Sequence, residues 1–324
     1  MRLPTPEDVL QARARITPHI VHTPMLRHPL LDARTGGTVL LKPETLQRTG
    51  SFKLRGATNA MRCLPEAARA AGVVTHSSGN HGQATACAAA SLGTRATVFM
   101  PADAPRIKVE STRSWGATII PFDRASDDRD ALAAAHVAAT GATLIPPFDH
   151  ADVIAGQGTL ALELIEDAAQ AGLTMDALLV CTGGGGMIAG CALAAEATSP
   201  ATRLYAVEPE GWDDTARSLA TGTRQSNDGK GSLLCDALLS RSPGRLTFAL
   251  NQPRLAGALV VTDAEVLAAI AFAFHHLKLV VEPGGAVCLA ALLAGRLDLR
   301  GQVAGCVLSG GNVDPAIFNR ALAT

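Results

Sequence analysis

One short stretch organises this chain, and it reads Thr49-Gly50-Ser51-Phe52-Lys53-Leu54-Arg55-Gly56-Ala57. A single lysine lies between glycines, directly after the apolar run 39–41, which is typical of a β-strand. A lysine that serves as an amine nucleophile needs a lowered pKa, through burial or through neighbouring cations. Arg55 supplies a second positive charge nearby. Taken alone, the stretch equally suits a surface loop with one solvated lysine, so other stretches must decide.

The whole-chain numbers favour a globular α/β protein with a neutral surface. The 324 residues are 48% hydrophobic, 18% charged and only 3% aromatic, a composition far from that of disordered chains. The net charge of −1 argues against a nucleic-acid partner, which would favour a basic face. The chain lacks an uncharged apolar run of about 20 residues, so we predict no membrane span.

The cysteines indicate a reducing compartment. There are seven of them, an odd number, and the sequence contains no C-x-x-C pair. Most lie in apolar runs, which favours buried free thiols over a disulfide framework or a zinc site. The N-terminal residues 1–8 lack the apolar core of a signal peptide. We therefore predict a cytoplasmic protein.

Short β-branched runs alternate with helical patterns along most of the chain. The start Thr5-Pro6-Glu7-Asp8 predicts a capped helix that ends near Ile16. Further helices are expected at 58–64, 83–91, 107–115, 127–139 and 158–171. The expected strands are 39–41, 73–75, 96–100, 118–120, 143–145, 177–180, 203–207 and 303–308. This alternation predicts doubly wound parallel sheets.

A run of glycines follows one of these strands. It reads Cys181-Thr182-Gly183-Gly184-Gly185-Gly186-Met187 and opens a helix. Successive glycines let backbone N–H groups converge on an anion, and the helix N-terminus adds positive potential. The spacing matches neither a P-loop nor a clean dinucleotide motif. We interpret it as a phosphate cradle for a small cofactor, with a closely packed turn as the alternative.

A second polar turn has the same strand-to-helix position and reads Ser77-Ser78-Gly79-Asn80-His81-Gly82. Its hydroxyls, amide and backbone N–H groups suit a substrate carboxylate, although a simple cap and turn would have the same pattern. Ser309 ends the last strand, where open α/β sheets place ligand contacts. Glu208 and Asp214 offer hard oxygen ligands for a cation, or they merely cap a turn.

Together and in this order, these stretches resemble the fold-type II pyridoxal-phosphate (PLP) enzymes, and within them the serine/threonine dehydratase and serine racemase family. The resemblance spans nearly the full chain. It rests on the segments 51–57, 77–83, 156–159, 183–186 and 309–312. It implies a tryptophan synthase β-like fold. Residues 1–68 and 150–324 would form a large PLP-binding domain, and residues 69–149 a small mobile substrate-binding domain.

The resemblance also implies a role for each motif residue. Lys53 would hold the cofactor covalently and Phe52 would flank its ring. The residues implied to bind PLP are Phe52, Lys53, Asn80, Gly183, Gly184, Gly185, Gly186, Met187 and Ser309. Those implied to bind the substrate are Ser77, Ser78, Asn80, His81 and Arg129. Those implied to hold a divalent cation (Mg²⁺, Mn²⁺ or Ca²⁺) are Glu208, Trp212 through its carbonyl, and Asp214.

The activity that the resemblance implies is β-elimination of water from a small β-hydroxy-α-amino acid of the serine or threonine type. The products would be a 2-oxo acid and ammonia. We expect a homodimer, and no membrane or nucleic-acid partner. Two further activities stay open.

The first is serine racemisation. In the racemases of this family the serine that matches Ser78 is an acid/base on the opposite face of the cofactor ring. Phe148 looks more like a dehydratase residue.

The second open activity is dehydration of 3-hydroxyaspartate, and it depends on Arg129. In serine racemases the segment that matches 126–129 carries an arginine within reach of a distal carboxylate. Alternatively, Arg129 starts a helix among acidic residues and stays solvated. A non-enzymatic nucleotide-binding protein would also use glycine loops, but it would have no use for Lys53.

Overall fold

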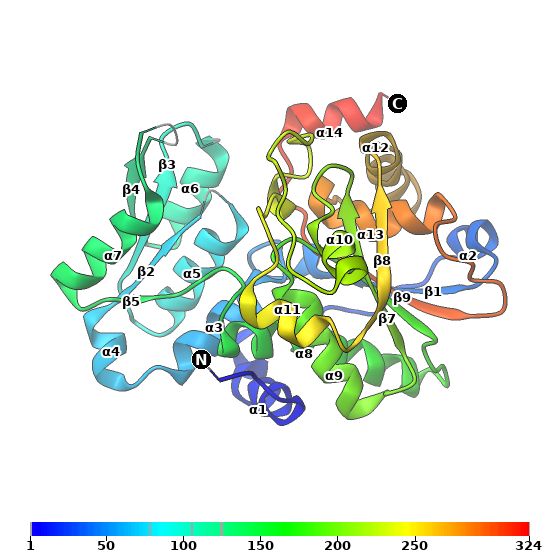
Figure 1. Ribbon diagram of the computed structural model, residues 1–324, viewed down its shortest axis with the longest axis horizontal. Coiled ribbons are helices and arrows are strands. Elements are labelled where there is room, and N and C mark those ends of the chain that lie inside the picture. The colour runs from blue at the N-terminus through cyan, green and yellow to red at the C-terminus, as the bar shows by residue number, and fades with distance from the viewer. Residues whose placement is uncertain (1, 78, 105, 124–125, 324) are drawn as a thin grey trace.

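The computed structural model describes residues 2–77, 79–104, 106–123 and 126–323. Within these residues two parallel sheets form two lobes, which lie side by side in Figure 1. The larger sheet has the strand order β1-β9-β6-β7-β8 and the smaller has the order β4-β3-β2-β5. All pairings between the named strands are parallel. The predicted fold-type II α/β architecture is confirmed.

The strands are β1 Thr38–Pro43, β2 Val73–His76, β3 Ala96–Pro101, β4 Thr118–Phe122, β5 Thr143–Leu144, β6 Ala177–Cys181, β7 Arg203–Pro209, β8 Leu255–Val261 and β9 Val303–Leu308. The α-helices are α1 Pro6–Ile16, α2 Pro29–Thr35, α3 Lys53–Cys63, α4 Glu66–Ala71, α5 Asn80–Ser91, α6 Arg106–Ser114, α7 Arg129–Thr140, α8 Ala151–Gln170, α9 Gly186–Thr198, α10 Asp214–Thr221, α11 Arg245–Asn251, α12 Asp263–Phe272, α13 Pro283–Leu293 and α14 Pro315–Leu322. Shorter helical turns are η1 Thr17–His19, η2 Glu44–Leu46, η3 Asp236–Leu238 and η4 Ala273–Leu277.

The local signals for the first helix are confirmed. The Thr5 side chain accepts from the Asp8 N–H, and the Asp8 carboxylate accepts from the Thr5 N–H at 2.7 Å. The strand predicted at 39–41 forms the buried centre of β1. None of the helices in the described part of the chain is long and apolar enough to cross a membrane.

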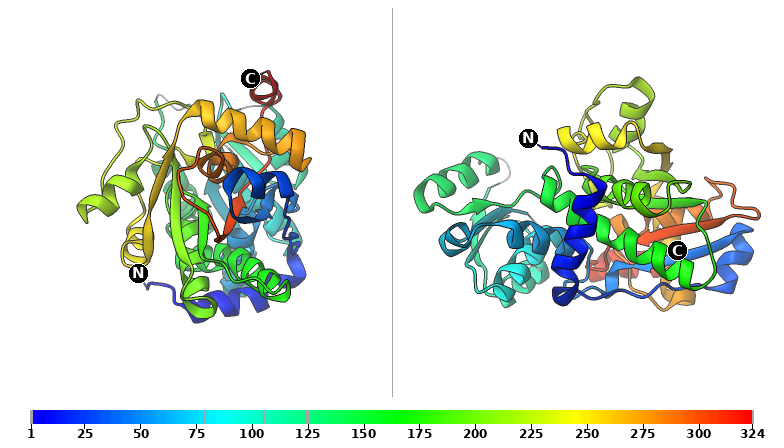
Figure 2. Two further views of the ribbon diagram at one scale, coloured as in Figure 1. Left: turned by 90° about the vertical axis from the view of Figure 1, so that its right-hand side faces the viewer. Right: turned by 90° about the horizontal axis from the view of Figure 1, so that it is seen from below.

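Helices cover both faces of the large sheet. In Figures 1 and 2, helices α1, α8 and α9 lie on one face and α12 and α13 on the other. The chain leaves β6 through α9 to reach β7, and it returns from β8 through α12 and α13 to reach β9. Because right-handed crossovers in opposite directions put their helices on opposite faces, a crevice opens at the carboxyl ends of β6 and β9.

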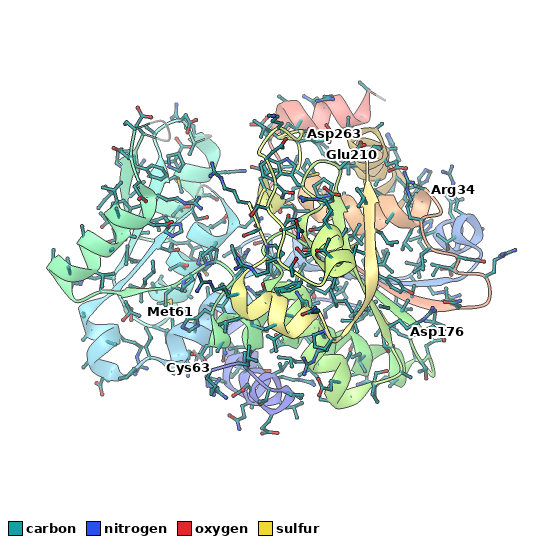
Figure 3. The ribbon with its side chains drawn as sticks, viewed as in Figure 1. Arg34, Met61, Cys63, Asp176, Glu210 and Asp263 are labelled. Carbon is teal, nitrogen blue, oxygen red and sulfur yellow. The ribbon has the colours of Figure 1, made fainter. Side chains whose placement is uncertain are left out.

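In the small sheet, too, the chain fills the strands first in one direction and then in the other. The chain moves outward from β2 to β4 and then returns through α7 to β5, which pairs with the other edge of β2. The carboxyl ends of β2 and β5 therefore flank a second crevice. Figure 3 shows the direction of the strands in the large sheet. Glu210 and Asp263, just past the carboxyl ends of β7 and β8, lie on one side of the sheet, and Asp176, which precedes β6, lies on the other.

A buried charge cluster lies behind the lysine stretch. The Arg55 guanidinium donates to Glu44 Oε2 and to Glu163 Oε1, each at 2.7 Å, and Lys42 Nζ donates to Glu163 Oε2 at 2.7 Å. All four side chains are buried. Two cations thus neutralise two carboxylates inside the large lobe. The cluster ties the first turn of α3 to β1 and α8.

This cluster corrects one expectation. Arg55 points toward Glu44 and Glu163, so it is not the second cation that lowers the pKa of Lys53. Helix α3 also begins at Lys53 itself and not near residue 58, and α8 begins at Ala151 and not at Gly158. The two helices pack closely at these positions. A Cβ on Gly156 would lie 2.7 Å from the Arg55 carbonyl oxygen, so glycine at 156 allows close contact between α8 and α3 and does not form a turn.

Candidate active site

A cleft of about 800 Å³ lies where the two crevices face each other. It is lined by residues from both lobes, and most of the predicted site residues are among them. The predicted residues that line it are Phe52, Lys53, Ser77, Asn80, His81, Arg129, Gly183, Gly184, Gly185, Gly186, Met187, Trp212 and Ser309. Residues from widely separated parts of the sequence therefore meet at one site. Ser78 lies outside the described residues.

Lys53 is the first residue of α3 and extends into this cleft. Its Nζ donates to the Pro147 carbonyl oxygen at 2.8 Å, which places the amine between the two lobes. Burial lowers the pKa of Lys53 to about 8, and the nearby Glu282 carboxylate opposes part of this shift. Because an amine nucleophile must be neutral, this pKa leaves about a tenth of the group reactive at pH 7, far more than an ordinary lysine would have.

The turn that carries Lys53 is fastened to the end of β9. Ser51 pairs with Gly310 in an isolated antiparallel bridge, and the Phe52 N–H donates to the Ser309 carbonyl oxygen at 3.0 Å. Ser309 is buried and lines the same cleft. The lysine and the serine are therefore held in a fixed relation, although they lie at opposite ends of the sequence.

The glycine run forms the opposite wall, between β6 and α9. Gly185 has φ of +86°, which favours glycine, and a Cβ on Gly184 would lie 2.5 Å from the Phe148 ring. Helix α9 begins at Gly186, so its first N–H groups lack partners within the helix, and Gly186 and Met187 line the cleft. The Gly184 carbonyl is turned away and accepts from Thr247 Oγ1 at 2.7 Å. This loop is suited to hold a phosphate.

The small lobe contributes the turn after β2. The Asn80 side chain donates to Glu282 Oε1 at 2.6 Å and accepts from Asn312 Nδ2 at 2.7 Å, so it bridges the lobes. His81 Nε2–H donates to the Ile145 carbonyl oxygen at 2.9 Å. Burial, followed by the charge of Lys53, lowers the pKa of His81 to about 3, which keeps the imidazole neutral.

Several buried polar atoms of the described residues lack protein partners at this site or beside it, and two of them are acceptors. His81 Nδ1, which is an acceptor because Nε2 carries the proton, has no hydrogen-bond partner in the described part of the chain, and the same holds for Asn251 Oδ1 next to the glycine loop. Gln157 Nε2, on the cleft wall, is an unpartnered donor. With the free N–H groups at the start of α9, these donors and acceptors fit a phosphorylated, aldehyde-bearing cofactor such as PLP.

Arg129 is exposed at the mouth of the cleft, where it begins α7. The α7 start is capped by Asp128, which accepts from the Asp130 and Ala131 N–H groups. The positive charge of Arg129 also acts on His76. The pKa of His76 is lowered, mainly by burial and next by the charge of Arg129. Arg129 therefore starts a helix and lines the cleft at the same time.

The three residues of the expected cation site lie at the ends of β7 and α10. Glu208 accepts from the Thr215 and Ala216 N–H groups at 2.9 and 2.8 Å, and Asp214 Oδ1 accepts from Asn227 at 2.6 Å. Burial, reinforced by Asp214, raises the pKa of Glu208 to about 8. Burial also raises the pKa of Asp214 to about 6, and its Oδ2 lacks a partner among the described residues.

These carboxylates fit a hard cation only with further oxygen ligands. In the described residues no group of three or more His, Cys, Asp or Glu side chains is arranged to hold a metal. A cation would therefore need main-chain carbonyls, such as that of Trp212, and water in addition to the two carboxylates.

Sequence reasoning missed two features of the cleft. Glu282 is buried on its floor, and burial, reinforced by Asp236, raises the pKa of Glu282 to about 7. Lys108 on α6 pairs with Asp236 on η3, an ion pair that crosses between the lobes. The only signal for Glu282 was its place before Pro283 and two glycines at the start of a helix. The Lys108 pair had none.

Comparisons with known proteins agree with this geometry. The model of the family described as pyridoxal-phosphate-dependent enzyme matches residues 16–310. The chain is 44% identical to an L-threo-3-hydroxyaspartate ammonia-lyase from a Pseudomonas species, over 97% of both chains. It is 40% identical to a serine racemase from Schizosaccharomyces pombe, over 96% of this chain and 95% of the relative. The chain belongs to the PLP-dependent enzymes.

A solved structure extends the similarity to three dimensions. A threonine deaminase from T.th. superposes with a TM-score of 0.91 at 41% identity, covering 96% of this chain and 99% of that one. The relatives thus include ammonia-lyases, a racemase and a deaminase on one architecture.

Proposed function

We propose that this chain is a PLP-dependent ammonia-lyase that eliminates water from small β-hydroxy-α-amino acids. The products are a 2-oxo acid and ammonia. One observation carries the proposal: the partly neutral amine of Lys53 lies in one cleft with the glycine loop, Ser309 and the polar turn of the small lobe. The names of the relatives supply the reaction class.

In this proposal each wall of the cleft binds one part of the cofactor. The N–H groups of residues 183–187 hold the phosphate, and Phe52 packs against the ring. Asn80 would bond the ring oxygen, and Ser309 would face the ring nitrogen. Asn80 is already oriented for this by Glu282 and Asn312. When bound, PLP supplies an electron sink next to the substrate α-carbon.

The remaining steps belong to the protein. Lys53 Nζ holds the cofactor and then carries the proton from the substrate α-carbon. Ser77 and the N–H groups at the start of α5, that of His81 among them, bind the substrate carboxylate. Ser309 would present a neutral hydroxyl, and not a carboxylate, to the cofactor ring, which would favour rapid loss of the β-hydroxyl as water. Closure of the two lobes excludes water from the cleft.

Among β-hydroxy amino acids, two observations favour 3-hydroxyaspartate as the substrate. The 44% identical relative is named for L-threo-3-hydroxyaspartate. Arg129 lines the cleft with an exposed guanidinium, on the small-lobe side from which a substrate side chain would be reached. A guanidinium and a carboxylate pair bidentately, and such a charge-assisted contact contributes ~1.5–3 kcal/mol.

The first prediction concerns this arginine. Arg129→Ala should lower kcat/KM for L-threo-3-hydroxyaspartate by about ten- to a hundredfold, because the distal carboxylate loses its partner. The value for serine should change less than about threefold. Steady-state release of 2-oxo acid measures both, with Arg113→Ala as a control on the exposed surface of α6. Equal loss on both substrates, or loss on neither, would show that Arg129 does not bind a side-chain carboxylate.

Racemisation is the second candidate function. It is supported by the 40% identity to a serine racemase, and the residue it needs, Ser78, lies outside the described residues. A Ser78→Ala variant separates the two activities: elimination requires only Lys53 on the α-proton, whereas racemisation requires a second acid/base on the other face of the ring.

We further propose a divalent cation at Glu208, Asp214 and the Trp212 carbonyl. The support is the buried carboxylate pair, whose raised pKa values reflect the cost of burying negative charge. A bound Mg²⁺, Mn²⁺ or Ca²⁺ would offset that cost and would use the unpartnered Asp214 Oδ2.

The second prediction tests this site through stability. A cation at a hundredfold excess over its dissociation constant should stabilise the fold by about 2.7 kcal/mol, so the melting temperature should rise with the cation and fall with a chelator. Glu208→Gln should abolish the shift, whereas Glu210→Gln, at an exposed neighbouring position, should retain it. If neither cation nor chelator moves the wild-type melting temperature, the site is only a turn.

Four expectations remain proposals. The domain boundaries 1–68, 69–149 and 150–324 are supported by the two separate sheets. The mobility of the small domain, a homodimer and a cytoplasmic location rest on the resemblance and on the composition.

The proposed function is tested with a panel of β-hydroxy amino acids. Serine, threonine and both diastereomers of 3-hydroxyaspartate are incubated with the PLP-loaded protein, and 2-oxo acid formation is followed. We expect turnover of at least one member, led by the L-threo isomer of 3-hydroxyaspartate. No 2-oxo acid from any of them would refute the proposal.

A further inference from the structure

A pair of thiols lies under the cofactor cleft, and neither takes part in the proposed reaction. The sulfur atoms of Cys181 and Cys288 are 3.5 Å apart. Cys181 is the last residue of β6, and Cys288 lies in the middle of α13. Both cysteines are buried and free. The two residues are 107 positions apart in sequence, so only the fold brings them together.

One member of the pair is open to the cleft. Cys181 lines the cleft together with Ser309 and the glycine loop, whereas Cys288 is fully buried behind it. Two residues after Cys181 the phosphate loop begins at Gly183. A small oxidant that enters an empty cleft therefore meets Cys181 first.

The local hydrogen bonds make the two thiols unequal. Burial opposes ionisation of Cys181, but hydrogen bonds from Cys288 and Ser309 outweigh it and lower the pKa of the Cys181 thiol. Burial raises the pKa of the Cys288 thiol well above its usual range. Since the thiolate is the reactive form, Cys181 is the better nucleophile of the two.

We propose that Cys181 and Cys288 are an oxidation site that closes to a disulfide when the cofactor is absent and is shielded when the cofactor is bound. The inference goes beyond the proposed function and requires only that PLP occupies the cleft. The bound cofactor, in contact with Ser309 and the glycine loop, would cover the approach to Cys181.

The chemistry balances with a peroxide as the oxidant. The Cys181 sulfur attacks one oxygen of hydrogen peroxide, the O–O bond breaks, and the sulfenic acid and one water form. The Cys288 sulfur then attacks the Cys181 sulfur and displaces the hydroxyl as a second water. Two thiols and one peroxide thus give one disulfide and two waters.

Closing the disulfide would change the cleft. An S–S bond is about 2.05 Å long, so the end of β6 and helix α13 must move toward each other from the present 3.5 Å contact. The glycine loop follows Cys181 directly and would move with it. The oxidised apoprotein should therefore bind PLP at least about tenfold more weakly, and a dithiol reductant should restore binding.

The test uses the full-length protein, with and without PLP, treated with hydrogen peroxide and digested with trypsin without reduction. Cleavage after Lys and Arg puts Cys181 in peptide 130–203 and Cys288 in peptide 279–296. Mass spectrometry should find these two peptides linked, at least tenfold faster in the apoprotein than in the PLP-loaded protein. A fluorescence titration with PLP measures affinity before and after dithiothreitol.

Matched variants locate the bond. Peptide 130–203 also contains Cys191, so Cys191→Ser should keep the link, whereas Cys181→Ser and Cys288→Ser should each lose it; circular dichroism checks that each variant is folded. Absence of the link in wild-type apoprotein, under conditions that oxidise the exposed Cys63, would overturn the proposal. Equal rates with and without PLP would overturn the shielding. Neither readout depends on turnover.

Discussion

Lys53→Ala should abolish turnover of every β-hydroxy amino acid, with a loss of about 10³-fold or more. In the proposed reaction this variant loses both the covalent anchor for the cofactor and the group that moves the α-proton. Borohydride reduction of the wild type should fix a pyridoxyl group on Lys53, and peptide mapping should find no such label in the variant. Lys230→Ala, at an exposed loop position, is the control and should be labelled at Lys53 as in the wild type.

The same amine gives an independent readout. Its neutral fraction rises as the pH rises through its pKa, so the rate at which apoprotein takes up PLP should increase through about pH 8, and not near the ordinary lysine value of about 10.4. A label on another lysine, or a midpoint near the ordinary value, would contradict the role assigned to Lys53.

Arg55→Met should destabilise the protein by about 3–5 kcal/mol, because it leaves two buried carboxylates with only one cation. Glu44 loses the partner that donates to both of its oxygens, and Glu163 keeps only Lys42. The fall in melting temperature measures this loss. Although the residue lies outside the cleft, the first turn of α3 that carries Lys53 depends on the cluster, so PLP affinity should fall as well.

The control for this prediction is an ion pair of similar length at the surface. Arg296→Met removes the partner of Glu265, and an exposed pair contributes only about 0–1 kcal/mol. If Arg55→Met lowers the melting temperature no more than Arg296→Met does, the buried cluster does not carry the stability assigned to it.

Much of this fold could be predicted from local patterns. Buried parallel strands such as 39–41 and 303–308 are continuous apolar runs, and the helix start at Thr5 has its full capping sequence. The glycine loop, Lys53 and Ser309 could be named because their chemistry requires particular residue types at strand ends. Each of these features depends on the residues of a single segment, so the sequence of that segment is enough to predict it.

What could not be predicted depends on contacts between distant segments. The glycine at position 56 looked like part of a loop, yet it lies inside α3, and a Cβ there would meet the Gln157 side chain at 2.4 Å, so glycine allows α3 to pack closely on α8. Arg55 looked like a neighbour of Lys53, yet its partners come from η2 and α8. The strand at 255–261 was missed because its faces are half-exposed and its apolar run resembles a helix segment. Glu282 lies in the cleft only because the two lobes meet there, so its position could not be predicted from its own segment.

Elimination at Lys53 can be distinguished from racemisation in a single reaction mixture. PLP-loaded protein is given L-threo-3-hydroxyaspartate, and ammonia, oxaloacetate and the stereoisomers of the substrate are quantified in one sample. We predict ammonia and oxaloacetate in a ratio of one to one, with Lys53→Ala producing neither. Accumulation of the inverted stereoisomer without ammonia, or no change in the substrate while serine and threonine are equally inert, would contradict the account.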